Sequence, residues 1–318
     1  MIKRTQIILI LIQSLIFSKE FPVHEIKLLG SITDPKQEIS GMDWFQDKLF
    51  FLPENQGGFL FLATKADIID AIKSKKNQPI TPMKTKFNTP DYSNLISGFD
   101  GFEAISFHKN KVFISIEAKH NEKMYGYIAW GKIDSKTFEI IIPEENLKKV
   151  TTPIQIDNMS FESMLWYNEN IYLLYEANGS NLNNKTNQIK FSPIDSRITR
   201  IKSMNLEYRI TDVTQIDSQN KFWCINYFWP GDKKLLNPNI NLILYEGETH
   251  QSSETVERLV ELEIKGDEII ISDSNPIQLV LDSSKSRNWE AIARLDNKGF
   301  LIATDKYPRM IFGYISIN

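Results

Sequence analysis

The chain has 318 residues and few of the residue types that build common metal and redox sites. Cys224 is its one cysteine, which excludes an intrachain disulfide and a cysteine-based zinc cluster. Net charge is close to neutral, at −3 from 37 basic and 40 acidic residues, and no basic block is present, so we do not expect nucleic-acid binding. The four histidines are scattered without metal-ligand spacing: His24, His108, His120 and His250.

Several sequence motifs are also absent. The chain contains no P-loop, no nucleophile elbow, no HExxH pair, no EF-hand loop and no dinucleotide-binding glycine motif. These absences remove the most direct sequence signals for nucleotide, zinc-protease or serine-hydrolase chemistry. A functional site in this chain must therefore be built from residues outside these motifs.

The N-terminal segment is too short to span a membrane. Lys3 and Arg4 precede an apolar run from Ile7 to Phe17, whereas a transmembrane helix needs roughly 18–20 residues. This pattern predicts a signal peptide over residues 1–18, cleaved after Ser18, and a periplasmic or secreted mature protein without a transmembrane span. The alternative is a buried N-terminal strand or a short interfacial helix.

An internal repeat runs through the rest of the chain. Each copy has an apolar residue, a polar one, a small or acidic one and an aliphatic one, followed by a turn and a second strand. The second strand ends in an acid or amide: Glu54, Glu117, Glu176, Asn226 or Asp305. The five copies begin at residues 39–42 (ISGM), 102–105 (FEAI), 161–164 (FESM), 210–213 (ITDV) and 289–292 (WEAI).

The spacing of these copies suits sheets of three or four antiparallel strands. Stacking such sheets around an axis gives an all-β β-propeller, which protects the strand edges. We predict a single domain over residues 19–318 with five blades. A sixth blade stays open because residues 210–289 form a long interval, and a β-sandwich or two small β domains are the alternatives.

The termini are expected to close the ring. Residues 300–304 and 310–317 would form the last blade together with an N-terminal strand within residues 24–32. One segment, residues 64–75, has the apolar periodicity of a helix. A propeller of this kind is expected to be a monomer.

The repeated acids are the candidate site. We expect Glu103, Glu162 and Glu290 to surround the axis at one mouth of the channel, with Ser40 and Thr211 at the same position in the other two blades. The offset of 14 between Glu103 and Glu117, and between Glu162 and Glu176, predicts that the two members of each pair lie directly opposite on adjacent strands.

Carboxylates this close repel one another unless a cation, a proton or a hydrogen-bond donor intervenes. An oxygen-rich ring suits a hard cation, and calcium tolerates irregular sets of 6 to 8 oxygen ligands. The sequence therefore predicts calcium bound by Glu103, Glu162 and Glu290. Alternatively, each acid accepts hydrogen bonds from the backbone of the neighbouring blade.

Basic residues near the same face would bind an anionic group. Lys119 and Lys306 each follow a repeat acid by 16 positions, and Arg287 shortly precedes the fifth copy. With the acids holding a cation, these three side chains are predicted to bind a small anionic ligand such as a phosphate or carboxylate. Solvated rim charges are the alternative.

Three phrases resemble the phytase-like propellers, described as having esterase-like activity of phytase. They are residues 38–42 (EISGM), 101–105 (GFEAI) and 288–293 (NWEAIA), the last followed by 299–305 (GFLIATD). The last block is the most specific, although Ala104, Ser163 and Ala291 stand where that family usually has glycine. The resemblance implies a secreted or periplasmic propeller with calcium and phosphoester chemistry.

Two functions follow as hypotheses. The first is a calcium-dependent phosphoester or carboxyl ester hydrolase in which Glu117 or Glu176 is the general base. The second is a non-catalytic propeller that binds a ligand or a protein partner at its mouth, in which the repeat acids have a structural role. Phe228 and Trp229 are candidates to line a ligand pocket there, while Cys224 is expected in the core.

Overall fold

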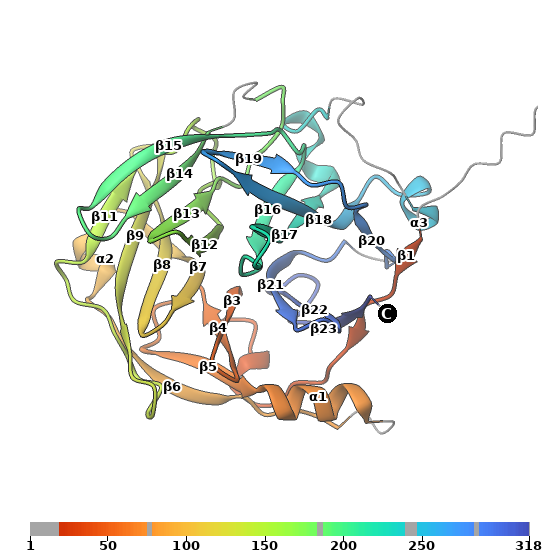
Figure 1. Ribbon diagram of the computed structural model, residues 1–318, viewed down its shortest axis with the longest axis horizontal. Coiled ribbons are helices and arrows are strands. Elements are labelled where there is room, and N and C mark those ends of the chain that lie inside the picture. The colour runs from red at the N-terminus through yellow and green to blue at the C-terminus, as the bar shows by residue number, and fades with distance from the viewer. Residues whose placement is uncertain (1–18, 75–77, 183–186, 239–246, 283–285, 318) are drawn as a thin grey trace, which may run out of the picture.

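The computed structural model describes residues 19–74, 78–182, 187–238, 247–282 and 286–317. Three hydrogen-bonded sheets surround a central axis, and two of them each contain two blades; Figure 1 views the molecule down that axis. The inner strands β3, β7, β12, β16 and β21 contact one another in a closed cycle, in which β21 returns to β3. The predicted all-β propeller is confirmed, and the described residues form five blades.

The first two blades share a continuous sheet. Blade 1 contains β3 (Ile39–Phe45), β4 (Lys48–Pro53), β5 (Phe59–Thr64) and β6 (Met83–Asn88). Blade 2 contains β7 (Phe99–His108), β8 (Lys111–His120), β9 (Lys123–Ile133), β10 (Ile140–Ile141) and β11 (Leu147–Val150). Parallel pairing of β6 with β10 joins the outer edges of the two blades.

Blades 3 and 4 are joined in the same manner, through parallel pairing of β15 with β19. Blade 3 contains β12 (Ser163–Tyr167), β13 (Asn170–Leu174), β14 (Asn187–Ser192) and β15 (Arg197–Ser203). Blade 4 contains β16 (Arg209–Val213), β17 (Lys221–Phe228), β18 (Val256–Lys265), β19 (Glu268–Ile271) and β20 (Ile277–Leu279). The long interval thus adds strands to blade 4, and its described residues form no sixth inner strand; residues 239–246 lie outside the description.

The termini close the ring as predicted. Blade 5 contains β21 (Trp289–Leu295), β22 (Gly299–Thr304) and β23 (Phe312–Ser316), and the N-terminal strand β2 (His24–Glu25) pairs with β23. The preceding strand β1 (Glu20–Phe21) pairs with β20 of blade 4, so the N-terminal segment contacts two blades. The predicted signal peptide over residues 1–18 lies outside the described residues.

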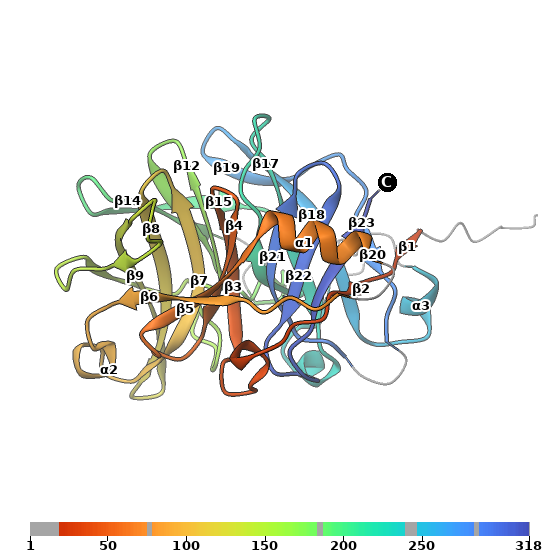
Figure 2. The same ribbon diagram turned by 90° about the horizontal axis from the view of Figure 1, so that it is seen from below.

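Helices are short and lie outside the sheets, as Figure 2 shows for α1 on the rim. The helix predicted over residues 64–75 is α1 (Lys65–Lys73), which begins after Thr64 because the Thr64 side chain caps the Asp67 N–H. The others are α2 (Tyr92–Leu95), α3 (Glu248–Gln251) and the 3₁₀ turns η1 (Ser31–Thr33) and η2 (Pro230–Lys234). Within the described part of the chain, no helix is long and apolar enough to cross a membrane.

The hydrophobic core is divided among the blade interfaces. Five large clusters each combine side chains of two neighbouring blades, and Cys224 lies in the one between blades 3 and 4. Burial of this apolar surface is the main stabilising contribution, and it is spread around the ring. Each blade therefore depends on both neighbours, which keeps the ends of the inner strands in fixed positions around the axis.

Candidate functional site

The repeat residues lie at a backbone irregularity near the start of the inner strands. In β7 the register with β8 shifts between Phe102 and Ala104, and in β21 the register with β22 shifts between Trp289 and Ala291. Glu103 and Glu290 are therefore bulge residues without a directly paired partner, and Ser40 has the same place in β3.

The predicted direct pairing of the acids is wrong because of these bulges and of two-residue hairpin turns. Glu117 lies opposite Gly101, not opposite Glu103. The Glu176 N–H donates to the Ser160 carbonyl, which places Glu176 two residues from the expected register with Glu162. In blade 4 Asn226 pairs with Ile210. The acids still gather at one end of the channel, but from staggered positions.

That end of the channel contains a cavity of about 280 Å³. Acidic groups from blades 1, 2, 3 and 5 line it, against two basic side chains, Arg209 and Lys306. A β-carbon at Gly101 would overlap the side chain of Glu54, so this glycine makes room for Glu54. The remaining lining residues are Glu38, Ser40, Asp100, Glu103, Glu117, Asn158, Glu162, Asn288, Glu290, Asp305 and Tyr307.

Burial raises the pKa of every carboxyl group at the centre of this cavity. For Glu103, Glu162 and Glu290 burial is the largest cause, and the neighbouring carboxylates add to it, so their pKa values lie well above the usual range. The pKa of Glu54 rises to about 8 through burial and contact with Glu38. Burial and the charge of Glu176 raise the pKa of Glu117 to about 8. Without a cation, several of these groups are protonated at neutral pH.

Glu176 lies behind the cavity, fully buried, and does not line it. Its Oε1 accepts from the Arg209 guanidinium at 2.5 Å, and the same guanidinium donates twice to Asp232, at 2.7 and 3.0 Å. Burial still raises the pKa of Glu176 despite the adjacent arginine. Glu162 contacts Glu176, and one oxygen of each carboxyl group has no hydrogen-bond donor among the described residues.

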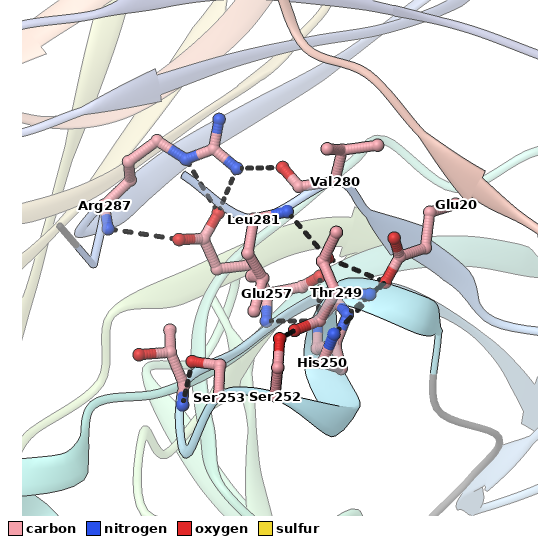
Figure 3. A network of polar contacts seen from close by, with 10 residues as sticks. Glu20, Thr249, His250, Ser252, Ser253, Glu257, Val280, Leu281 and Arg287 are labelled. Atoms are coloured by element: carbon pink, nitrogen blue, oxygen red, sulfur yellow. Dashed lines mark hydrogen bonds and ion pairs between the residues drawn. The ribbon is translucent and has the colours of Figure 1, made fainter. Parts of the chain in front are cut away.

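The structure brings one of the three predicted basic residues into the cavity. Lys306 lines it and pairs with Glu38 at 2.5 Å. Lys119 is exposed and pairs with Asp157, also at 2.5 Å. Arg287 pairs with Glu257 at 2.7 Å (Figure 3) and does not line the cavity. Of the three predicted basic residues, Lys306 alone lines this cavity, and Arg209 is the second basic residue there.

The donor set suits a hard cation, because it is rich in carboxyl oxygens and the Glu162 Oε2, which has no hydrogen-bond partner among the described residues, is free to coordinate one. Within the described ranges, however, no three acidic, histidine or cysteine side chains are grouped closely enough to hold a metal ion. A cation would therefore require carboxylates such as Glu103 and Glu290 to rotate toward it. The oxygen ligands predicted from the sequence are of the kind that calcium prefers. In this structure, however, these side chains are not gathered closely enough to hold the ion.

Two repeat positions with hydroxyl side chains link neighbouring blades, and one of them, Ser40, also lines the cavity. The Ser40 hydroxyl donates to the Phe102 carbonyl, and the Thr211 hydroxyl donates to the Trp289 carbonyl, each at 2.6 Å. Both bonds join neighbouring blades through a hydroxyl donor, so they differ from the alternative stated above, in which the repeat acids accept from the backbone. They also fix the start of the neighbouring inner strand, including the approach to Glu103 and Glu290.

Several lining residues were not predicted. Glu38 and Asn288 are the residues just before the first and fifth repeat copies, and their equivalence in the two hairpins is a signal that the sequence contains. Asp100 lies just before Gly101. Asn158 and Tyr307 lie outside the repeat pattern, so no sequence signal of this kind identifies them.

Neither a protein-family model nor a curated protein matches the chain. Among solved structures, an exo-1,5-α-L-arabinanase from a bovine ruminal metagenomic library matches at 10% identity over 88% of this chain and 93% of that one, with a TM-score of 0.47. A GH62 α-L-arabinofuranosidase catalytic domain of Coprinopsis cinerea matches at 9% identity over 94% and 98%, with a TM-score of 0.48.

A thermostable family-43 glycoside hydrolase also matches, at 10% identity over 88% of both chains and a TM-score of 0.47. Identities and TM-scores this low carry no inference about activity. The named structures are glycoside hydrolases, so the narrower likeness to phytase-like propellers stays a prediction. Fold and site together define a β-propeller with an acidic channel mouth.

Proposed function

We propose that the protein is a β-propeller hydrolase that cleaves phosphoester or carboxyl ester bonds at the acidic mouth of its channel. The observation that supports this most strongly is the cavity itself, in which carboxyl groups from four blades face two basic side chains. Carboxyl groups with pKa values near or above neutrality are the groups that general acid–base catalysis requires. The N-terminal segment supports an extracytoplasmic location as part of the same proposal.

Glu117 is the proposed proton-transfer residue. It lines the cavity, and a pKa of about 8 keeps it mostly protonated near neutral pH, so we assign it the role of the general acid that donates to a leaving oxygen, in place of the general base predicted from the sequence. Glu176 has no access to the cavity, so we give it a positioning role: it holds Arg209 and contacts Glu162. Lys306 is the residue placed to contact a negatively charged part of the substrate.

Glu103, Glu162 and Glu290 are the proposed calcium ligands. When bound, calcium would polarise the ester oxygen and offset the mutual repulsion of these carboxylates. The bulge at Glu103 and that at Glu290 release these side chains from strict cross-strand pairing and give them freedom to turn inward. Asn288 supports Glu290 through a side-chain hydrogen bond.

The test is hydrolysis of p-nitrophenyl phosphate, p-nitrophenyl acetate and phytate by the purified chain, with calcium and with a chelator. We expect turnover of at least one ester and a loss of about 10²- to 10⁴-fold in kcat for Glu117→Gln. Glu169→Gln is the matched control, because Glu169 is an exposed glutamate in a hairpin turn outside the acidic cavity. No turnover of any of the three esters would contradict the proposal, and turnover that is indifferent to the chelator would remove calcium from it.

A non-catalytic propeller is the second candidate, and the interblade bonds of Ser40 and Thr211 favour it. They show that repeat positions serve the ring itself. On this account neither the wild type nor the Glu117→Gln variant hydrolyses any of the three esters. The mouth of the channel then binds a ligand or a protein partner.

A further inference from the structure

A second cavity of about 780 Å³ adjoins the acidic one. Four residues line both cavities: Asn158, Arg209, Asn288 and Tyr307. The two spaces are therefore neighbours at the same mouth of the channel. We call the larger one the vestibule; its other lining residues are Tyr227, Trp229, Ser286 and Pro308.

The vestibule has a different chemical character from the acidic cavity. Arg209 is the one charged residue among the side chains that line it, and its guanidinium is already neutralised by Asp232 and Glu176. The rest of the lining consists of aromatic rings, a proline, two amides and a hydroxyl. Such a surface favours an uncharged group with an apolar face, and its volume falls within the about 300–1,000 Å³ of small-molecule sites.

Trp229 forms a wall that the local backbone is built to hold. Its side chain is 52% exposed, which is unusual for so large an apolar group. A β-carbon at Gly231 would overlap the indole ring, so the glycine allows the ring to lie against the η2 turn. Asp232, in the same turn, is fixed by its two bonds from Arg209. The turn that carries Trp229 is therefore anchored to the floor of the site.

Tyr307 provides a second exposed ring on the boundary between the two cavities. It is 60% exposed, and the Lys306 ammonium lies 5.5 Å from its ring centroid. The Tyr227 hydroxyl is hydrogen-bonded to Ser286 at 2.8 Å, which orients a third ring toward the vestibule. Two rings from the end of β17 and the residue after it, and a third from the segment after β22, thus line the space next to the carboxyl groups.

We propose that the vestibule binds an uncharged ring-bearing group of the substrate, aryl or glycosyl, while the scissile ester bond lies in the acidic cavity. This inference rests on the proposed function for the ester bond, and it deepens that proposal by naming the substrate class. Trp229 and Tyr307 are the specificity-determining residues. An apolar ring face packs against their rings, and the amides of Asn158 and Asn288 can bond to ring substituents.

The test measures binding without turnover. Ligand-observed NMR titrations with 4-nitroanisole and with methyl β-D-glucopyranoside distinguish the aryl from the glycosyl source of the ring. We expect saturable binding of at least one probe, weakened roughly tenfold in Trp229→Ala and weakened also in Gly231→Ala, which displaces the indole without removing it. Ile194→Ala, a change at an apolar side chain that is 77% exposed and does not line the vestibule, is the control.

A second arm compares kcat/KM for phenyl acetate and methyl acetate. Phenoxide is the better leaving group in every variant, so the readout is the ratio of the two kcat/KM values: Trp229→Ala should lower the phenyl-to-methyl ratio roughly tenfold relative to the wild type, and Ile194→Ala should keep the wild-type ratio. Absence of saturable binding of both probes, or equal binding by wild type and Trp229→Ala, overturns the inference. If neither probe binds but methyl acetate is hydrolysed, the ring-binding inference is wrong and the hydrolase proposal is unaffected. If a probe binds but no ester is hydrolysed, the hydrolase proposal is wrong and ring binding by the vestibule is retained.

Discussion

The second residue of each repeat copy has one of two roles in this ring, and its side-chain type decides which role it has. A serine or threonine there, as at Ser40 and Thr211, can donate to the neighbouring strand's carbonyl. At Glu103 and Glu290 the side chain at this position is a carboxyl group that lines the cavity. The carboxyl positions therefore add acids to the candidate site, whereas the blades with hydroxyl positions supply other lining residues, Glu38 and Glu54 from blade 1 and Arg209 from blade 4.

Asp43, a buried acid farther along the inner strand β3, also links two blades. It accepts backbone N–H bonds from Phe107 of blade 2 at 2.7 Å and from Trp44 at 2.8 Å. Asp212 does the same between blades 4 and 5, through the Ile292 N–H at 2.8 Å. Burial outweighs these bonds and raises the pKa of Asp43 to about 7.

The Asp43 shift predicts a falling stability between about pH 4 and pH 7. The folded state retains the Asp43 proton over this range while the unfolded state releases it, so the free energy of unfolding decreases as pH rises. In Asp43→Asn the side chain at this position does not titrate, so the variant is the reference for the pH dependence that Asp43 causes. We expect the stability of the wild type relative to this variant to fall by up to about 1.4 kcal/mol per pH unit. Denaturant unfolding of both proteins at several pH values checks it, and a pH-independent difference would contradict it.

At the scale of secondary-structure elements, ring closure depends on a short N-terminal segment. One carboxylate oxygen of Glu20, on β1, accepts hydrogen bonds from the Thr249 hydroxyl, the Thr249 N–H and the His250 ring, at 2.8, 2.9 and 2.8 Å. His250 in turn contacts the backbone of Glu257, whose carboxylate binds Arg287. Figure 3 shows this network, which connects β1 to α3, β18 and the segment before β21.

Loss of the Glu20 carboxylate is expected to weaken this closure. Glu20→Ala leaves buried donors on α3 without an acceptor, which costs about 1–3 kcal/mol. Glu25→Ala is the matched control, because the ion pair of Glu25 with Arg309, in the loop before β23, is exposed and contributes about 0–1 kcal/mol. Thermal and denaturant unfolding of the two variants should separate them. Equal destabilisation would show that the Glu20 network does not hold the segment.

The elements were largely predictable and their register was not. Alternating apolar residues and repeated turn residues predict the hairpins, and the apolar spacing predicts α1. The bulge at Glu103 and the two-residue turn after His108 are not visible in residue spacing, because an offset of 14 is compatible with more than one turn length. The pairing of Glu117 with Gly101 follows only from the backbone hydrogen bonds.

At the scale of the whole molecule, the five interface clusters bring distant parts of the sequence to one mouth. Glu54, Glu117, Glu162 and Glu290 come from four blades, and the repeat pattern was sufficient to predict that they converge. It was not sufficient for Asp232, because the η2 turn that carries it follows β17 and has no counterpart in the other repeats, whereas Trp229 was a candidate for a pocket at the mouth and lines the vestibule. The acidic cavity takes its acids from four blades, and the vestibule combines the end of β17 and the segment after it with residues of blade 5 and of the segment before blade 3.

Calcium titration calorimetry at pH 8 tests the central claim most directly, namely that the carboxyl groups at the mouth act together as a cation site. The account predicts saturable calcium binding by the wild type and by Glu169→Gln, and binding about tenfold weaker or worse in Glu290→Gln, since one ligand charge is lost. Absence of calcium binding by the wild type, or equal binding by Glu290→Gln, would contradict the claim.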